Sequence, residues 1–265
     1  MNLLGAAILL VDALIVAALG RAKPLAIAVR AVAIVVGSWV VLILTMRLDT
    51  PWGIEPEVLS FWVGDRLRRP PEDAIVFTGS STIAHWSSLR ADMAPLPVLN
   101  RGISGSRAHQ ISFHADRLVL PYHPSAVVFY AGENDIVGVF WSAKKSPAQV
   151  LAAFRGFCEK VHAQLPDVPI YFVSIKPQQR SPQWWPAIDQ ANALVRDYCG
   201  SDVRLHFIDV VPAMLDAEGR PRGDIFERDG IHLNTAGYHI LTTAVKPALM
   251  GAFQGAVPIR TGGER

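Results

Sequence analysis

After Asp73 the sequence alternates between short apolar runs and longer stretches with helical periodicity. This alternation is typical of a parallel sheet whose strands are joined by covering helices. The predicted strands are residues 74–78, 98–100, 126–130, 170–175 and 205–209. We therefore expect an α/β domain over residues 74–252, a three-layer α/β/α sandwich around a five-stranded parallel sheet, followed by a disordered tail over residues 253–265.

Three of the connecting stretches predict helices. Ser146 and Pro147 are typical of an N-cap and a first helical residue, and apolar residues follow at helical spacing as far as Leu165. A second helix is predicted over residues 188–198, and a last one starts near Asn234. In open sheets of this kind ligands bind beyond the carboxyl ends of the strands, which is where the polar motifs of this sequence occur.

Two long apolar runs, at about residues 3–20 and 25–46, precede the α/β domain. Each is close to the length of about 20 residues that a helix needs to cross a bilayer. The short polar break at residues 21–24 fits a hairpin turn, so residues 1–47 are predicted to form two transmembrane helices. A cleaved signal peptide is the alternative, but no basic side chain precedes the first run.

Basic residues in the predicted turn suggest an orientation, because such residues favour the cytoplasmic side of a membrane. The expected location is therefore a membrane, with the α/β domain on the non-cytoplasmic face, periplasmic or extracellular. Residues 48–73 form a connector in which residues 57–68 are predicted to be a helix next to the membrane. Trp52, Phe61 and Trp62 of this connector could lie among lipid headgroups or pack on the α/β domain.

The charge pattern argues against a nucleic-acid partner. The chain has 25 Lys and Arg against 23 Asp and Glu, a net charge of +2, without a block of like charge. The two cysteines, Cys158 and Cys199, lack the spacing of a metal site, so we expect them to be structural, as buried free thiols or as a disulfide. No metal and no cofactor are expected.

A serine motif, Gly79-Ser80-Ser81-Thr82-Ile83, follows the first predicted strand directly. Ser81 is thereby placed at the start of a helix, where free backbone N–H groups favour the negative charge that develops in acyl transfer. A serine at such a position is also typical of a simple helix N-cap.

The next two strands are followed by further polar motifs. Gly105 follows the second strand and could aim its N–H into the same pocket, since glycine lets the backbone approach a ligand closely. Asn134 follows the third strand and could donate to an oxyanion from its side-chain amide. Ordinary turns use the same residue types.

The fourth motif, Asp229-Gly230-Ile231-His232, immediately precedes the last predicted helix. Histidine can act as a general base near neutral pH, and an aspartate three residues earlier could fix its tautomer. The same pair could cap the helix or bind a metal, but the sequence shows no further cluster of metal ligands.

Together these motifs resemble the SGNH/GDSL hydrolase family, whose sequence blocks carry Ser, Gly, Asn and Asp-x-x-His in this order. The resemblance spans residues 55 to about 249, and segments 117–121 and 174–177 look like the small bacterial GDSL-type esterases. It implies a flavodoxin-like sheet. It also implies a serine ester hydrolase, an esterase or lipase that acts through an acyl-enzyme.

The resemblance assigns a role to each site residue. Ser81 would be the nucleophile, His232 its base and Asp229 the partner of His232. The oxyanion hole would consist of the backbone N–H groups of Ser81 and Gly105 and the side chain of Asn134. Ser80 stands where the family usually has Asp, which leaves open how hydrogen bonds position the nucleophile.

Small acyl esters are the expected substrates, with acetylated glycans and lysolipids as further candidates. One alternative is an O-acyltransferase that uses the same serine, and another is a non-catalytic envelope protein that keeps the fold for binding. Trp184 and Trp185, together with Phe140 and Trp141, could line an acyl or sugar pocket, or they could be ordinary packing residues.

Overall fold

The computed structural model describes residues 24–47, 50–71, 73–139 and 142–256. It divides into two units, Met1–Arg47 and Leu48–Arg265. In the first unit, α2 (Pro24–Arg47) confirms a helix over the second apolar run, and its exposed side chains include Val29, Val36 and Trp39. The first apolar run, at residues 3–20, lies outside the described residues.

The predicted transmembrane hairpin is not supported by the structure. Among the described residues, no helix combines the length and the apolar character needed to cross a membrane.

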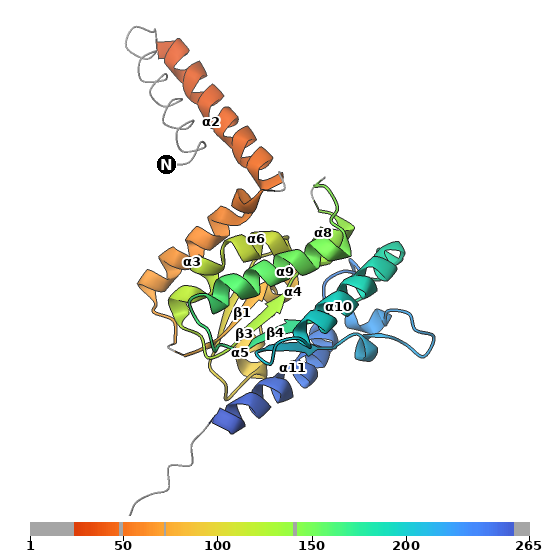
Figure 1. The fold of residues 1–265 in the computed structure, drawn as a ribbon. Coiled ribbons are helices and arrows are strands. Elements are labelled where there is room, and N and C mark those ends of the chain that lie inside the picture. Colours follow the sequence, from red (N-terminus) through yellow and green to blue (C-terminus); the bar gives the residue numbers. More distant parts are fainter. Residues whose placement is uncertain (1–23, 48–49, 72, 140–141, 257–265) are drawn as a thin grey trace, which may run out of the picture. The chain divides into compact units, whose positions relative to one another are not determined.

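The second unit contains the predicted five-stranded sheet (Figure 1). The strands are β1 (Ile75–Gly79), β2 (Val98–Gly102), β3 (Val127–Tyr130), β4 (Ile170–Val173) and β5 (Leu205–Ile208). Their order is β2-β1-β3-β4-β5, and every neighbouring pair is parallel, so the fold prediction is confirmed. Gly79 at the end of β1 pairs with Gly102 of β2 and Tyr130 of β3, which brings these three carboxyl ends to one level.

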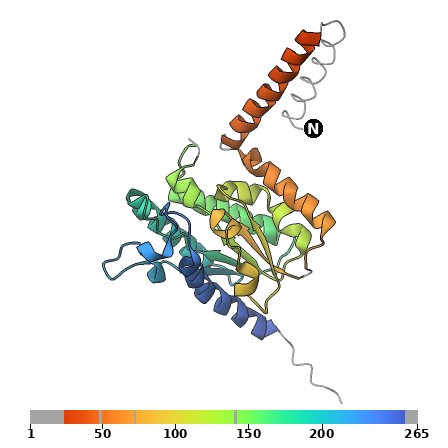
Figure 2. The same cartoon turned by 180° about the vertical axis from the view of Figure 1, so that it is seen from behind.

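Helices cover both faces of the sheet. Figure 1 shows α9 and α10 in front of the strands, and Figure 2 shows the blue α11 on the opposite face. The helices of this unit are α3 (Glu55–Leu67), α4 (Ser81–Ala84), α5 (Leu89–Asp92), α6 (Ala108–Phe113), α7 (Ala115–Leu118), α8 (Glu133–Val137), α9 (Pro147–His162), α10 (Trp185–Cys199) and α11 (Thr235–Ala256). Short 3-10 turns are η1 (Pro51–Ile54), η2 (Leu120–Tyr122), η3 (Pro182–Trp184), η4 (Pro212–Met214) and η5 (Gly223–Ile225).

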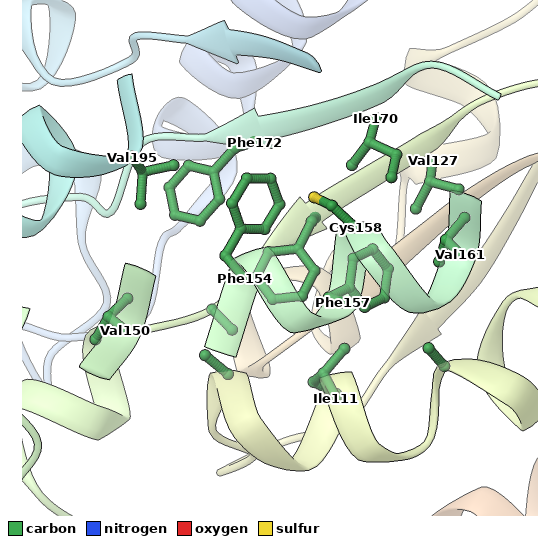
Figure 3. Close-up of a cluster of buried hydrophobic side chains, with 14 of the residues drawn as sticks. Ile111, Val127, Val150, Phe154, Phe157, Cys158, Val161, Ile170, Phe172 and Val195 are labelled. Carbon is green, nitrogen blue, oxygen red and sulfur yellow. The ribbon is translucent and has the colours of Figure 1, made fainter. Parts of the chain in front are cut away.

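The hydrophobic core consists of two clusters, one on each face of the sheet. Alternate residues of a strand point to opposite faces, and in β3 Phe129 belongs to the cluster under α9 whereas Val128 belongs to the cluster under α11. Under α9 the rings of Phe154, Phe157 and Phe172 lie close together (Figure 3), and the Phe154 and Phe172 centroids are 4.9 Å apart. The Phe129 ring of β3 joins them, with its centroid 4.7 Å from that of Phe157. The apolar strand residues therefore hold the helices of both layers.

The predicted starts of α9 and α11 agree with the structure, and α10 begins at Trp185, three residues before the predicted range of 188–198. Ser146 caps α9 by accepting from the Gln149 N–H at 3.3 Å, and the Gln149 side chain accepts from the Ser146 N–H at 2.9 Å. The Asn234 side chain accepts from the N–H groups of Ala236 and Gly237 at 2.9 and 3.1 Å as α11 begins. Helix α11 continues to Ala256, into the range that was expected to be a tail, and residues 257–265 lie outside the described part.

The connector packs on the α/β domain through polar contacts. Helix α3 confirms the predicted helix, and its Asp65 carboxylate lies 2.5 Å from Arg101 at the end of β2. Trp52 packs edge-on against Phe113, with ring centroids 5.1 Å apart, and the guanidinium of Arg101 lies 4.8 Å from the ring of Phe61. Phe61 therefore packs on the domain, whereas Trp52 contacts Phe113 but stays 38% exposed and Trp62 is 47% exposed.

Cys158 in α9 and Cys199 in α10 are buried free thiols in the structure. Burial raises the pKa of the Cys199 thiol to about 12 and, together with the nearby Cys199, raises the pKa of Cys158 further. Both sulfurs are therefore protonated and unreactive at neutral pH, because the thiolate is the reactive form.

Candidate active site

Ser81 is the first residue of α4 and follows a sharp turn at the end of β1. Gly79 makes this turn with φ +142°, and a Cβ on Gly79 would lie only 1.8 Å from the carbonyl oxygen of Tyr130. The next residue, Ser80, donates its N–H to the same carbonyl at 2.9 Å. The turn thus depends on glycine and holds Ser81, which is 8% exposed, at the carboxyl edge of the sheet.

The loop after β2 is bound to the same end of β1. The Ile103 N–H and the Ser106 hydroxyl both donate to the carbonyl of Gly79, at 2.8 and 3.1 Å. Between them Gly105 takes φ +75°, a conformation that favours glycine. Within the described chain, the N–H groups of Ser81 and Gly105 donate to no other residue. Both donors are therefore available to a ligand.

Asn134 joins this group from α8, at the end of β3. Its side-chain amide donates to the carbonyl of Ser106 at 2.9 Å, immediately after Gly105. A side-chain amide carries two N–H donors, so one remains for a ligand. The structure therefore places the three predicted donor residues, Ser81, Gly105 and Asn134, on segments that meet at one edge of the sheet.

Asp229 and His232 form a close pair in the loop before α11. Their atoms Asp229 Oδ2 and His232 Nδ1 are 2.5 Å apart, and Asp229 Oδ1 accepts from the N–H groups of Ile231 and His232, each at 2.9 Å. Burial opposes ionisation of Asp229, but these hydrogen bonds outweigh it and lower the pKa of the carboxyl to about 2. Asp229 is therefore ionised at neutral pH and faces the Nδ1 side of the imidazole.

Two contacts bring this loop to the Ser81 turn. The imidazole of His232 lies 4.8 Å, centroid to centroid, from that of His85, whose N–H donates to the carbonyl of Ser81 at 2.8 Å. The Tyr238 hydroxyl of α11 donates to the carbonyl of Thr82 at 3.1 Å. Burial and the neighbouring His232 lower the pKa of His85, so His85 is neutral beside the pair at neutral pH.

No hydrogen bond joins the Ser81 hydroxyl to His232 in the described chain. Hydrogen bonds between a nucleophile and its base are often long in free enzymes and shorten when substrate binds. The arrangement is nevertheless one that can do acyl transfer, since a serine, a histidine oriented by a carboxylate and a set of N–H donors converge at one edge of the sheet.

Residues 63–240, more than half of the chain, match the GDSL-like Lipase/Acylhydrolase family. The chain belongs to this family. The family resemblance inferred from the four motifs is therefore confirmed, and with it the assignment of the protein to the esterase-like acylhydrolases.

Three known proteins are similar to this chain over most of their length. The human platelet-activating factor acetylhydrolase IB subunit alpha1 is 24% identical over 197 residues, which cover 71% of this chain and 80% of the relative. A GDSL-like lipase from Bacteroides thetaiotaomicron has a TM-score of 0.63 at 20% identity, covering 74% of this chain and 98% of that one. A carbohydrate esterase family 3 protein from Talaromyces cellulolyticus has a TM-score of 0.55 at 17% identity, covering 69% and 100%.

The aromatic residues expected near a pocket give a mixed result in this GDSL domain. Trp184 and Trp185 are partly buried against the core cluster under α9, and the Lys144 ammonium lies 4.0 Å from the ring centroid of Trp184. These contacts favour a packing role for both side chains. Phe140 and Trp141 lie outside the described residues. Among the residues that are described, no cluster of His, Cys, Asp or Glu could hold a metal.

Sequence reasoning missed a buried polar cluster beside Asn134. Glu133 and Lys176 form an ion pair with 4% and 1% of their side chains exposed, and Tyr130 and Gln178 also contact the Glu133 carboxylate. The sequence does show a charged residue after each of two strands: Glu133 lies within the third motif, and Lys176 follows the fourth strand. This was a visible signal of a polar cluster at the edge of the sheet. Their pairing across 43 residues was not visible in the sequence.

Proposed function

We propose that this GDSL-family protein is a serine ester hydrolase that acts through an acyl-enzyme. The observation that carries the proposal is the Asp229–His232 pair, 2.5 Å apart, on a loop that contacts the turn of Ser81 through His85. When a carboxylate accepts a hydrogen bond from the Nδ1–H of an imidazole, the Nε2 atom is left to accept a proton. A base that acts on a serine hydroxyl requires such an acceptor.

The proposed reaction has two halves. His232 takes the hydroxyl proton of Ser81, and the oxygen attacks the carbonyl carbon of the ester. The N–H groups of Ser81 and Gly105 and the amide of Asn134 donate to the resulting oxyanion. When the intermediate collapses, the alcohol leaves with the proton from His232, and the acyl group stays on Ser81.

Water completes the second half. His232 removes a proton from water, the hydroxide attacks the acyl carbon, and collapse of the second oxyanion releases the carboxylic acid and returns the proton to Ser81. Asp229 stays ionised throughout, because its pKa of about 2 lies far below that of an imidazolium, and it stabilises the positive charge on His232.

Acetyl and other small acyl esters are the substrates that we propose. The human relative is named an acetylhydrolase, which supports a short acyl group. Acetylated glycans and lysolipids share the same ester chemistry and differ in the alcohol. Since one fold can serve many substrates, the alcohol must come from measurement.

The test is hydrolysis of p-nitrophenyl esters of increasing acyl length by the full chain in detergent, beside its Ser81→Ala variant. The proposal expects turnover by the wild type, with a preference for the shortest acyl chains, and near-complete loss in the variant. Folded Ser81→Ala protein with undiminished turnover would refute the role of Ser81. Adding a sugar acceptor tests the acyltransferase alternative, which requires more acyl transfer than hydrolysis.

We also propose that residues 1–47 anchor the protein in a membrane, with the hydrolase domain on the non-cytoplasmic face. The support is the pair of apolar runs in the sequence and the exposed apolar side chains of α2. Extraction of membranes with alkaline carbonate tests the anchoring, and protease treatment of sealed cells tests the orientation. Release of the full chain by carbonate would refute the anchor. Protection of the domain from protease in cells whose cytoplasmic membrane is intact and directly exposed to the protease would refute the orientation.

A further inference from the structure

The buried ion pair of Glu133 and Lys176 lies at the carboxyl edge of the sheet, beside the segments that carry Ser81 and Asn134. Lys176 Nζ is 2.6 Å from Glu133 Oε1, with almost no solvent access to either side chain. The same oxygen accepts from Gln178 Nε2, and the other carboxylate oxygen accepts from the Tyr130 hydroxyl at 3.0 Å. Removing two charges from water is unfavourable, and a well-packed apolar pair often gives equal or greater stability. Stability alone therefore does not explain why a charged pair is buried at this place.

On one side, the pair is connected to the nucleophile and to the oxyanion donors. Glu133 directly precedes Asn134 in α8. Tyr130, which donates to Glu133 through its hydroxyl, also accepts the Ser80 N–H at its carbonyl, one residue before Ser81. Burial and the Glu133 carboxylate raise the pKa of Tyr130 well above its ordinary value, so the tyrosine remains a donor.

On the other side, the pair is connected to the loop that carries the histidine. Gln178, which donates to Glu133, is followed by Gln179 and Arg180, whose backbone N–H groups both donate to the carbonyl of Gly230, at 3.2 and 3.4 Å. Gly230 lies between Asp229 and His232 in the chain.

A second contact reaches the same loop. The Lys176 ammonium lies 5.9 Å from the ring centroid of Phe226, within the range of a cation–π interaction. Phe226 forms a backbone bridge with Leu233, and the adjacent Glu227 N–H donates to the carbonyl of His232 at 2.8 Å. The loop of the base is thus attached to the pair at two points.

We propose that the buried Glu133–Lys176 pair, together with the Gln178 amide bonded to Glu133, positions the Asp229–His232 loop relative to Ser81 and Asn134. This role rests on the ester-hydrolase function proposed above. None of these three positioning residues takes part in the chemistry. The Glu133 carboxylate holds segment 176–180 against α8, and that segment holds the carbonyl of Gly230. Without the pair, the segment is free to shift, and the imidazole moves away from the hydroxyl of Ser81.

The experiment compares three variants of the full chain. Glu133→Gln removes the charge with almost no change of shape. Gln178→Met removes one of the two side chains that join Glu133 to segment 176–180 and leaves the other, Lys176, in its ion pair with Glu133. Asp65→Asn is the matched control, since it makes the same acid-to-amide change in the ion pair with Arg101, on α3.

Two readouts separate positioning from stability. The first is kcat and KM for p-nitrophenyl acetate. A displacement of about 1 Å costs about 10²-fold in rate, so we expect kcat to fall about 10- to 100-fold in Glu133→Gln and Gln178→Met, with KM nearly constant. The second is the low-field NMR resonance of the His232 Nδ1 proton, assigned by its loss in Asp229→Asn. We expect it to shift or broaden in both variants and to stay unchanged in Asp65→Asn.

The outcomes are distinct for the two proposals. Folded Glu133→Gln and Gln178→Met proteins with wild-type kcat and an unchanged His232 resonance would overturn the positioning role and leave the hydrolase function intact. A wild type without Ser81-dependent hydrolysis would overturn the function, and the resonance would then decide the positioning role by itself. If Glu133→Gln does not fold, Gln178→Met decides by the same two readouts.

Discussion

Replacing Gly79 by alanine tests whether the turn after β1 sets the position of the nucleophile. The Gly79 backbone has φ +142°, and an added Cβ would lie 1.8 Å from the carbonyl oxygen of Tyr130 and 2.6 Å from its carbon. The clashing atoms are backbone atoms of the neighbouring strand, which cannot rotate away. Strand β1 and the turn must therefore separate from β3, and Ser81 moves with them.

The size of the effect follows from this geometry. An ordinary contact begins at 3.4 Å, so the Cβ and the Tyr130 oxygen must separate by about 1.6 Å. A displacement of about 1 Å in a reacting group can cost about 10²-fold in rate, equivalent to about 2.7 kcal/mol on the barrier. The strained φ adds about 1–3 kcal/mol to the cost of folding. We expect kcat to fall by at least about 10²-fold, and stability to fall as well.

The assay is p-nitrophenyl acetate hydrolysis beside thermal unfolding, with Gly219→Ala as the matched control. Gly219 also has positive φ, +75°, but a Cβ there would meet nothing within 4 Å. The control therefore carries the conformational strain without the clash and lies in the turn of residues 216–219. It should lose stability and keep its kcat. If folded Gly79→Ala protein retained kcat within about threefold of the wild type, the turn would not fix the nucleophile, and this reasoning would be wrong.

The site and the core support four further predictions. Asn134→Ala removes one oxyanion donor and should lower kcat by about 10²–10³-fold with little change in KM, as measured with the same ester. Asp229→Asn should lower kcat by about 10⁴-fold, because the amide no longer fixes the tautomer of His232; a kcat within tenfold of the wild type would contradict the pairing. The Asp229 carboxyl has a pKa of about 2 in the folded protein, below its ordinary value of 3.8, so its contribution to stability is fully present above 3.8 and is lost as the pH falls through about 2. The difference in melting temperature between wild type and Asp229→Asn should accordingly shrink over that range of pH. Iodoacetamide should label Cys158 and Cys199 only after unfolding, because both thiols are buried and have raised pKa values; mass spectrometry that finds them labelled in native protein would contradict this.

The sheet could be predicted from the sequence because its three central strands, β1, β3 and β4, are buried along their whole length. Each of these strands is a short apolar run bounded by polar or turn residues, and such runs have few alternative structures. The start of α9 was equally visible, because Ser146 and Gln149 form a capping box that the sequence displays directly. Local interactions of this kind depend on neighbours in the chain, so they can be read from a single sequence.

The packing of the connector depended on distant residues, and the sequence left it open. Trp52 and Phe61 suit both a lipid interface and a protein core. Asp65 pairs with Arg101 across 36 residues, and Glu55 pairs with Arg117 across 62. A pattern of charges along the chain does not specify such partners. The buried pair beside Asn134 escaped prediction for the same reason, since each member alone is an ordinary charged residue after a strand.

The four site motifs could be predicted, but the way they are held could not. Ser81 lies on a buried turn that the sheet fixes through the Ser80–Tyr130 hydrogen bond, whereas the Asp229 and His232 side chains are 38% and 33% exposed on a loop. Exposed loops open at a lower free-energy cost than the strands of a sheet. The hydroxyl of Ser81 has no hydrogen bond to His232 in the described chain, so one of the two must move for the proton to transfer. Rotation of the Ser81 side chain leaves the sheet intact. A shift of its backbone would strain the Ser80–Tyr130 hydrogen bond beside the β1–β3 pairing, and a shift of the loop would not. We therefore expect substrate binding to shift the His232 loop and to leave the Ser81 turn in place.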